Sequence, residues 1–379
     1  MSGNCLFDLL TPHLMSVPLL RPLLPDANAL LPYLQRIDNN RFYTNFGPLH
    51  QEFLQRLLTL QLRKDGSTVH GLLTTSATLG LELAIAALDL PAGSHVGVPA
   101  LTFVATATAI ARCGHVPVVL DVDLPSWLLK PEQMPQGADL QNIKAVIPVS
   151  TFGMPQDALA WSSWSKNHRI PVIIDAASAW GAQSTAEGIT AVFSLHATKA
   201  LSSGEGGLIL TGDPELASRL RNMTNFGIGQ NSPTLGSNAK MSEYHAAIGL
   251  AHLDIWPQQV DARNKLLSRY HQALSPAIPK LLVFQQDTGL YSPSLFCVSL
   301  ASEVLREKLE EKCAAGGIQT RRWYLPLLQD QPMLKSVSKL RPTPNADSLA
   351  KTVIGLPFFV DMDEQQLAKV VQVVLSLTT

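Results

Sequence analysis

The stretch IPVIIDAASAWGAQSTAEGITAVFSLHATKALSSGEGGLILT, residues 170–211, decides the fold of this chain. Its apolar runs predict three short strands, over Pro171–Ile174, Val192–Ser194 and Gly207–Thr211. These runs show little polar alternation, as expected for strands that are covered on both faces. Asp175 follows the first strand and Lys199 follows the second. A side chain at the carboxyl end of such a strand lies where open α/β sheets bind their ligands.

Outward from this stretch, helical and strand-like segments alternate from about residue 50, which is typical of a layered α/β domain. Further strands are predicted over His95–Val98, His115–Leu120 and Ile143–Val149, and helices over Gln51–Leu62, Leu79–Leu88, Val104–Ala111, Asp157–His168 and Pro214–Asn222. A long helix is predicted from Ser242 to Leu274, with a kink or break at Pro257.

The pattern changes after residue 275. Strands are predicted over Leu281–Gln285 and Leu295–Leu300, and helices over Glu303–Cys313 and Asp363–Leu375. We therefore expect an α/β protein with a large, mostly parallel, three-layer domain over residues 1–255 and a smaller α+β domain over residues 256–379.

The composition argues against several classes of partner. Hydrophobic residues make up 46% of the 379 residues, charged residues 16%, and the net charge is −1. A chain this close to neutral offers no basic surface to nucleic acid or to an anionic membrane, so neither partner is expected. The charged fraction is below the usual quarter or so of a soluble domain, which indicates surface buried by another subunit. An ordinary large core in a single chain explains the same number almost as well.

The cysteines and histidines show no metal-binding pattern, and no metal site is expected. The four cysteines are scattered: Cys5, Cys113, Cys297 and Cys313. The apolar N-terminus lacks the pattern of a signal peptide, and prolines and glycines interrupt the uncharged residues 90–111. These features predict a cytoplasmic protein with reduced cysteines.

Three separated pieces of sequence acquire a chemical meaning when they are taken together: Asp175, Lys199, and Thr74–Thr78 at the start of a predicted helix. Exposed N–H groups at a helix start favour a phosphate. A lysine for an imine, an acid for a pyridine nitrogen and a phosphate cup are what pyridoxal phosphate requires. Each piece alone has an ordinary explanation, as a surface lysine, a turn residue or a helix cap. Their combination predicts this cofactor.

Ten segments, in this order and at these spacings, make the chain resemble the DegT/DnrJ/StrS family of fold-type I aminotransferases. They are Asn45–Pro48, Thr75–Thr78, Pro99–Thr106, Asp121–Asp123, Phe152–Pro155, Asp175–Ala177, Ser194–Lys199, Gly204–Gly207, Asn238–Glu243, and Thr320-Arg321 with Tyr324–Pro326. The resemblance runs from about Asn45 to the final predicted helix. It implies a pyridoxal-phosphate enzyme that places amino groups on nucleotide-linked keto sugars.

The resemblance also implies roles for individual residues. Lys199 matches the lysine that carries the cofactor as a Schiff base and shuttles the proton, and Asp175 the partner of the pyridine nitrogen. Phe103 matches the aromatic residue that stacks on the cofactor ring, with core packing as the alternative.

For the phosphate, the resemblance implies the backbone of Ala77 and Thr78 together with the hydroxyls of Thr78 and Ser194. Asn238 matches an asparagine that reaches the phosphate of the neighbouring subunit, so a homodimer with shared active sites is expected.

Several positions depart from the family pattern. Ser178 stands where glutamine or histidine often contacts the cofactor's phenolic oxygen, and Ala77 stands where glycine is common. Ser150 and Leu328 occupy positions that are frequently histidine and lie toward the substrate in the family. Arg321 and Tyr324 are candidate substrate contacts, with interdomain packing as an equal alternative.

The expected reaction is a two-stage transamination from an amino acid, by analogy glutamate, to a keto sugar attached to a nucleoside diphosphate. A sugar dehydratase on the same fold is one alternative, although its subgroup has histidine in place of the lysine. A non-catalytic regulatory protein is another, but an intact Lys199–Asp175 pair argues against it. The glycines of residues 204–207 indicate a tight turn into a strand. His196 is expected to be structural because Lys199 already supplies the base.

Overall fold

The computed structural model describes residues 17–61, 68–228, 235–286, 293–335 and 337–377. Within these ranges an eight-stranded sheet has the order β1-β7-β6-β5-β4-β2-β3-β10. Its strands are β1 (His70–Thr74), β2 (His95–Pro99), β3 (Val116–Leu120), β4 (Ile143–Val146), β5 (Val172–Asp175), β6 (Ile189–Ser194), β7 (Gly207–Thr211) and β10 (Ser338–Lys339). β7 pairs antiparallel with both of its neighbours, and the other pairs are parallel. The predicted mostly parallel sheet is confirmed.

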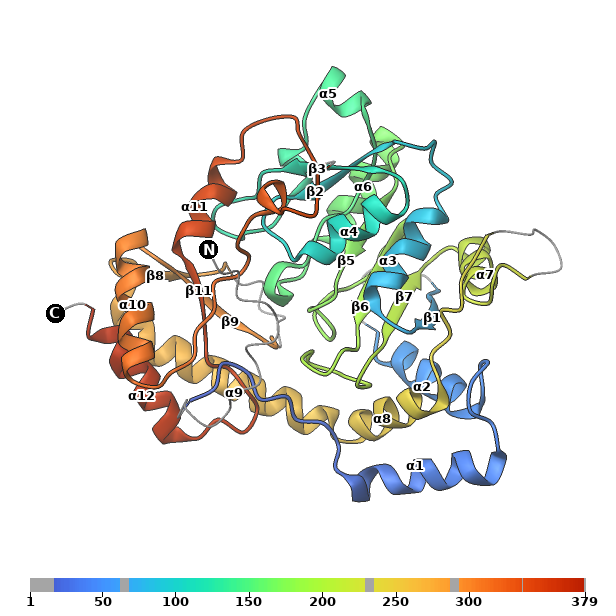
Figure 1. The fold of residues 1–379 in the computed structure, drawn as a ribbon, viewed down its shortest axis with the longest axis horizontal. Helices are drawn as coiled ribbons and strands as arrows, with labels where there is room; N and C mark the ends of the chain where they lie inside the picture. Colours follow the sequence, from blue (N-terminus) through green and yellow to red (C-terminus); the bar gives the residue numbers. More distant parts are fainter. Residues whose placement is uncertain (1–16, 62–67, 229–234, 287–292, 336, 378–379) are drawn as a thin grey trace.

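Helices cover both faces of this sheet (Figure 1). One face packs against α3 (Ala77–Ala86), α4 (Val104–Arg112) and α7 (Pro214–Met223), and the other against α1 (Ala27–Asn40), α2 (Pro48–Thr59), α5 (Ala138–Gln141), α6 (Ala158–His168) and α8 (Glu243–Asp254). In β5, Ile173 joins the first core while Val172 and Ile174 join the second, because successive side chains of a strand point to opposite faces. This arrangement confirms the three layers and explains the unbroken apolar runs.

Side chains that accept hydrogen bonds from the first turn fix where several helices begin. Ser76 accepts from Leu79 N at the start of α3, and Asp157 accepts from Leu159 N and Ala160 N at the start of α6. The helix predicted from Ser242 divides in two, because α8 ends at Asp254 and α9 (Trp256–Leu274) starts anew. Pro257 lies in the first turn of α9, where its missing N–H has no intrahelical partner to lose.

The smaller region contains a three-stranded antiparallel sheet in the order β11-β9-β8. Its elements are β8 (Leu282–Phe284), β9 (Phe296–Leu300), α10 (Glu303–Ala315), α11 (Pro344–Thr352), β11 (Val353–Leu356) and α12 (Glu364–Leu375). A separate core joins this sheet to α9, α10 and α12. In Figure 1, α8 and α9 follow one another from the large sheet toward this region.

The division at residues 255 and 256 stays a prediction, and two segments pass across it. β10 adds to the large sheet beside β3. Conversely, Val17 exchanges backbone hydrogen bonds with Gly317 and Gln319, so the N-terminal segment packs on the smaller region. No helix within the described ranges is both long and apolar enough to span a membrane.

Candidate active site

A cavity of about 490 Å³ lies where the carboxyl ends of β4–β6 meet the start of α3 and a segment of the smaller region. Nine of the ten site residues predicted from the sequence border this cavity: Ala77, Thr78, Phe103, Asp175, Ser178, Ser194, Lys199, Arg321 and Tyr324. Asn238, the tenth, is not among the residues that border it. The individual roles of all ten remain predictions.

Asp175 is the last residue of β5, and its side chain is 4% exposed. Oδ2 accepts a hydrogen bond from Thr106 Oγ1 at 2.7 Å, and Oδ1 accepts from Ala177 N at 3.1 Å. Burial raises the pKa of this carboxyl, and the bonds from Thr106 and Ala177 and the charge of Lys199 oppose the rise. The carboxylate is thus held in one orientation in surroundings that favour its interaction with a nearby positive charge.

Lys199 follows β6 after a short loop whose backbone bonds to the turn before β7. Ala197 N donates to Gly204 O at 2.8 Å, and Ser203 N donates to Leu195 O at 2.8 Å. The lysine Nζ donates to Ser178 Oγ at 2.9 Å. Burial lowers the pKa of the Lys199 amine, although the charge of Asp175 opposes the shift. A lowered pKa increases the neutral fraction of the amine, which is the form that acts as nucleophile or base.

The start of α3 supplies backbone donors to the same cavity. Ser76 Oγ accepts from Leu79 N at 3.2 Å, and Ser76 O accepts from Gly80 N at 3.0 Å. The N–H groups of Ala77 and Thr78 come before Leu79 N and Gly80 N in the helix, and they have no carbonyl within the helix to bind. Together with the helix dipole they form a site suited to a phosphate.

Two glycines let the loop after Lys199 and the start of α3 come close together. Gly204 has φ +81°, a conformation that glycine adopts without strain, at the turn into β7. A Cβ on Gly207 would lie 2.4 Å from Thr74 Oγ1 and 2.6 Å from the carbonyl of Ser76. The turn before α3 therefore rests directly on the backbone of β7, which is why a side chain cannot be accommodated there.

Aromatic side chains also line the cavity. Phe103 is 45% exposed and lies 6.0 Å from Tyr324, ring centroid to centroid. Tyr324 stacks on Phe152 at 5.3 Å with an interplanar angle of 12°. Burial raises the pKa of the Tyr324 hydroxyl, so it stays protonated at neutral pH and can donate a hydrogen bond. The exposed face of Phe103 is available to a planar ligand.

Three other predicted positions have different surroundings. Asn238 is exposed and pairs through its backbone with Asn225. Ser150 borders the cavity but is 2% exposed, and its hydroxyl donates to the buried Gln183 at 2.8 Å. Leu328 is fully buried in the core and is not among the residues that border the cavity. The leucine that stands here in place of the family's histidine therefore fills space in the core.

Sequence reasoning missed Thr106, which lies 69 positions from Asp175 in the chain and bonds to it. Thr106 belongs to one of the segments that carry the family resemblance and lies one helical turn after Phe103, which is the signal that could have identified it. Glu205 and His196 also border the cavity, with His196 Nε2 3.6 Å from Glu205 Oε1. His196 Nδ1 lies 2.9 Å from Thr198 Oγ1, a contact within its own loop.

Comparison with known proteins decides the family. The model of the DegT/DnrJ/EryC1/StrS aminotransferase family matches residues 26–375. The chain belongs to this family. It is 28% identical to a dTDP-4-amino-4,6-dideoxy-D-glucose transaminase of Shigella dysenteriae, over 93% of this chain and 97% of that protein. It is also 32% identical to a pleiotropic regulatory protein of Geobacillus stearothermophilus, over 80% of this chain and 83% of that protein.

A solved structure of similar sequence has the same fold. The crystal structure of DesI in the presence of its TDP-sugar product is 30% identical, with a TM-score of 0.83, and the match covers 94% of this chain and 92% of that one. The chain is therefore a pyridoxal-phosphate-dependent aminotransferase of fold type I.

The residues of the cavity fit this cofactor chemically. A buried carboxylate and an amine of lowered pKa border one space, and two helix N–H groups suited to a phosphate border it too. Because Gly207 has no Cβ, the turn before α3, which precedes the N–H groups suited to a phosphate, can lie directly against the sheet.

Proposed function

We propose that this enzyme moves an amino group from an amino acid, with glutamate as the first candidate, to a keto sugar carried on a nucleoside diphosphate. The observation that carries the proposal is the half-buried Lys199 together with the buried Asp175 at the strand ends, both bordering a cavity of about 490 Å³. This volume lies within the range of about 300–1,000 Å³ that ligand pockets usually have. The names of the Shigella transaminase and of the DesI complex support a sugar nucleotide as the acceptor.

Pyridoxal phosphate, when bound, supplies the carbonyl carbon that takes up the amino group and the ring that withdraws electrons from the reacting carbon. The chain would hold its phosphate with the N–H groups of Ala77 and Thr78 and the hydroxyl of Ser194. Asp175, oriented by Thr106 and Ala177, would hold the positive charge on the ring nitrogen.

Lys199 would move the proton, because burial lowers the pKa of its amine and leaves more of it neutral near pH 7. Ser178 accepts a hydrogen bond from this amine and keeps it directed toward the cavity. The shorter side chain of Ser178, compared with glutamine or histidine, leaves room for a bridging water to a cofactor oxygen.

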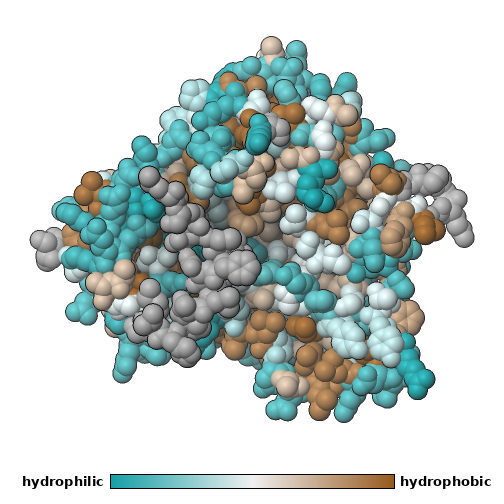
Figure 2. Space-filling model, in the orientation of Figure 1, coloured by the Kyte–Doolittle hydropathy of each residue, from teal (hydrophilic) through white to brown (hydrophobic). Residues whose placement is uncertain are grey.

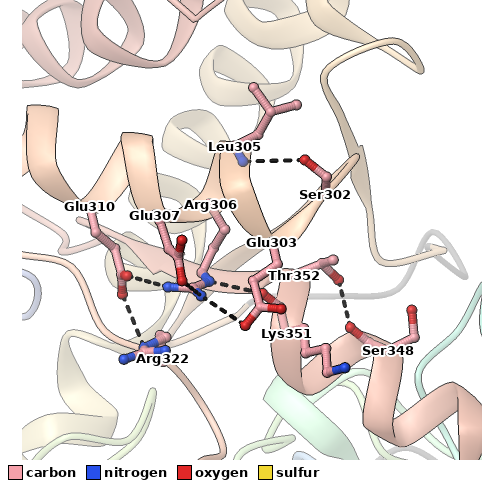
Figure 3. A network of polar contacts seen from close by, with 10 residues as sticks. All are labelled: Ser302, Glu303, Leu305, Arg306, Glu307, Glu310, Arg322, Ser348, Lys351 and Thr352. Carbon is pink, nitrogen blue, oxygen red and sulfur yellow. Dashed lines mark hydrogen bonds and ion pairs between the residues drawn. The ribbon is translucent and has the colours of Figure 1, made fainter.

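We assign Arg321 and Tyr324 to substrate binding. The Arg321 guanidinium lies 5.8 Å from the centre of the Trp323 ring, and its backbone is held by two hydrogen bonds to Gly355. Its neighbour Arg322 forms an ion pair of 3.3 Å with Glu310 (Figure 3). A positively charged side chain on a segment anchored in this way suits a diphosphate.

The proposed reaction is tested with purified enzyme that has been converted to its amino form with glutamate and freed of the donor. A panel of keto-sugar nucleotides is then added, and the products are identified by mass spectrometry. We expect a mass gain that corresponds to replacement of C=O by CH–NH₂ on at least one member of the panel. Loss of water from the sugar instead would support a dehydratase. No reaction with any donor or acceptor would leave a regulatory protein as the better explanation.

We also propose a homodimer in which Asn238 serves the partner's cofactor site. Asn238 is exposed and does not border its own cavity. Exposed hydrophobic side chains lie close to it in the chain, Phe226, Ile228 and Leu235, and a monomer would leave them in water. Figure 2 shows hydrophobic residues on the surface near α7 and also beside α1.

The shared site is tested by refolding Lys199→Ala and Asn238→Ala subunits together, each variant being nearly inactive alone. In a mixed dimer one site combines an intact Lys199 with an intact Asn238 from the other chain. Activity should then recover to as much as about a quarter of the wild-type value, since half of the randomly paired dimers are mixed and each has one good site. No recovery, despite demonstrated subunit exchange, would contradict the shared site.

The cytoplasm is the proposed location. Cys113, Cys297 and Cys313 carry free thiols in the described part of the chain, and burial raises the pKa of the Cys113 thiol to about 11. Thiols of this kind suit a reducing compartment. Cell fractionation with an antibody against the chain tests this, and recovery in an extracytoplasmic fraction would contradict it.

A further inference from the structure

A second, much smaller pocket of about 30 Å³ adjoins the main cavity. Lys199 and Ser294 border both spaces, so the two pockets meet at the reactive lysine. Arg263 of α9 forms another wall of the small pocket, and the segment Leu20–Leu23 covers it. Nothing in the expected reaction uses Arg263 or Ser294.

Arg263 is a buried cation that lacks an anionic partner among the described residues. Its side chain is 7% exposed, and Nη2 donates to the neutral Gln259 Oε1 at 2.9 Å, while Nη1 is buried and has no hydrogen-bond partner. Burial lowers the pKa of the guanidinium to about 10, so the group remains charged at neutral pH. A buried charge with an unpaired donor destabilises a fold unless an anion completes it.

Ser294 repeats this pattern on the same pocket. It is 8% exposed, and its buried Oγ has no hydrogen-bond partner among the described residues. Both residues thus border one small space, and each has a buried donor that lacks a hydrogen-bond partner among the described residues. Buried polar groups are normally paired, and exceptions call for a ligand or an ordered water.

The size of the pocket limits what can bind there. A water needs about 10–15 Å³ by this measure, so a volume of about 30 Å³ holds roughly two water-sized atoms. The two oxygen atoms of a carboxylate match this space. The planar guanidinium of arginine is also the group best suited to bind a carboxylate through two N–H donors.

We propose that Arg263 and Ser294 bind the α-carboxylate of the amino-acid donor. The proposal rests on the proposed function, because it takes an amino acid to be the donor. A carboxylate in the small pocket would place the adjacent carbon, which bears the amino group, beside Lys199 in the main cavity. The sugar acceptor has no carboxylate at this position, so the pocket would select donors and leave the acceptor half of the reaction unaffected.

The test compares wild type with Arg263→Met, Arg263→Lys and Ser294→Ala. Arg269→Met is the matched control, since Arg269 lies on the same helix and pairs at the surface with Glu364 at 3.0 Å. The rate constant kcat/KM of the donor half-reaction is measured with L-glutamate and with 4-aminobutyrate, which lacks the α-carboxylate. Arg263→Met should lower the rate with glutamate at least about tenfold, the loss typical of one charged hydrogen bond, and change the rate with 4-aminobutyrate less than about twofold. Arg263→Lys should be intermediate, and an equal effect on both donors would overturn the proposal.

A binding measurement separates this proposal from the proposed function. Glutarate, which has carboxylates but no amino group, is titrated calorimetrically into the cofactor-loaded enzyme. It should bind wild type and Arg269→Met alike, and bind Arg263→Met at least about tenfold more weakly. Equal affinity for all three would overturn the carboxylate site whatever the activity.

If wild type transfers no amino group from any amino acid, the proposed function fails, and the glutarate titration still decides whether Arg263 binds a carboxylate. Should Arg263→Met fail to fold, Ser294→Ala carries the same titration, with binding weakened about threefold or more.

Discussion

Two polar clusters of this molecule, each containing a buried charged residue, differ in how their charges are compensated. In the smaller region Arg306 is 1% exposed, and Nε donates to the backbone oxygen of Lys351 at 2.8 Å. Glu310 accepts from Nη1, Glu307 accepts from Nη2 at 3.2 Å, and Glu303 lies 3.6 Å from Nη2 (Figure 3). This guanidinium is surrounded by acceptors.

In the main cavity, by contrast, the two charged groups bind neutral partners. Lys199 donates to a serine hydroxyl and Asp175 accepts from a threonine hydroxyl and a backbone N–H. Burial favours the uncharged form of both groups, because it raises the pKa of Asp175 and lowers the pKa of Lys199.

The difference separates a structural cluster from a reactive one. The carboxylates around Arg306 accept hydrogen bonds from its guanidinium within the fold, so these interactions contribute to stability. The charged groups in the cavity are removed from water without full compensation, which lowers the stability of the fold. Proteins retain such destabilising groups where a bound ligand or a reaction uses them. Substitutions should therefore affect activity in one cluster and stability in the other.

The largest effect is expected for Lys199→Ala. Loss of the proton-transferring amine should lower turnover at least about a thousandfold, within the range for a positioned general base. The unfolding midpoint of the cofactor-free protein should stay equal or rise, because a partly buried amine with a lowered pKa is removed. Steady-state rates and thermal unfolding measure the two effects, with Lys265→Ala, an exposed residue paired with Asp261, as the control. Full activity in the purified variant would end the assignment of Lys199.

Arg306→Met should show the opposite pattern. The change removes several charged hydrogen bonds but leaves carboxylates that can turn to water, so the free energy of unfolding should fall by about 2–3 kcal/mol. Turnover per folded molecule should change less than about twofold. Chemical unfolding and kinetics at a temperature well below the midpoint measure this, and Arg269→Met is the exposed control. Unchanged stability would mean that the glutamates are ordinary surface charges.

Asp175→Asn is expected to lower the rate at least about tenfold, because an amide stabilises a ring cation less well than a carboxylate does. A charged hydrogen bond contributes about 1.5–3 kcal/mol, and about 1.36 kcal/mol corresponds to a factor of ten in rate. The measurement is kcat/KM for the donor half-reaction together with the absorption spectrum of the bound cofactor. An unchanged rate and spectrum would make Asp175 only a turn residue.

These clusters also show how much of the candidate site could be predicted from the sequence. Asp175 and Lys199 were predictable because each follows an apolar run, and the carboxyl ends of neighbouring parallel strands meet at one edge. β7 has the predicted bounds, since turn residues delimit it on the N-terminal side and a glycine on the C-terminal side. In such places local sequence and global fold require the same structure.

Other features depend on contacts that local sequence does not encode. α1 was not predicted, because it contains Pro32 and buries only Ile37. β10 has two residues and exists only through its pairing with β3. The pocket of Arg263 and Ser294 brings together a helix and a loop end whose relation depends on how the smaller region packs. Tertiary packing creates these features, so a pattern along the chain cannot reveal them.

The smallest effect is expected for Thr106→Val, which removes a hydrogen bond to Asp175 and keeps nearly the same shape. The bond from Thr106 stabilises the carboxylate and so lowers its pKa, while burial, the larger cause, raises the pKa above the ordinary 3.8. Without the hydroxyl the pKa of Asp175 in the folded protein should rise further. Between 3.8 and the raised value the folded protein binds more protons than the unfolded chain, so its stability falls as the pH rises.

In Thr106→Val this window extends to higher pH. The cofactor-free variant should therefore be less stable than wild type by about 1 kcal/mol where the carboxyl is ionised in both, and the difference should shrink as the pH falls through the raised pKa of Asp175. Chemical unfolding from pH 4 to pH 8 measures the difference, and Thr106→Ser, which keeps the hydroxyl, should follow wild type. A deficit that does not vary with pH would mean that Thr106 acts only through packing. The cavity cluster would then resemble the Arg306 cluster more closely than its hydrogen bonds indicate.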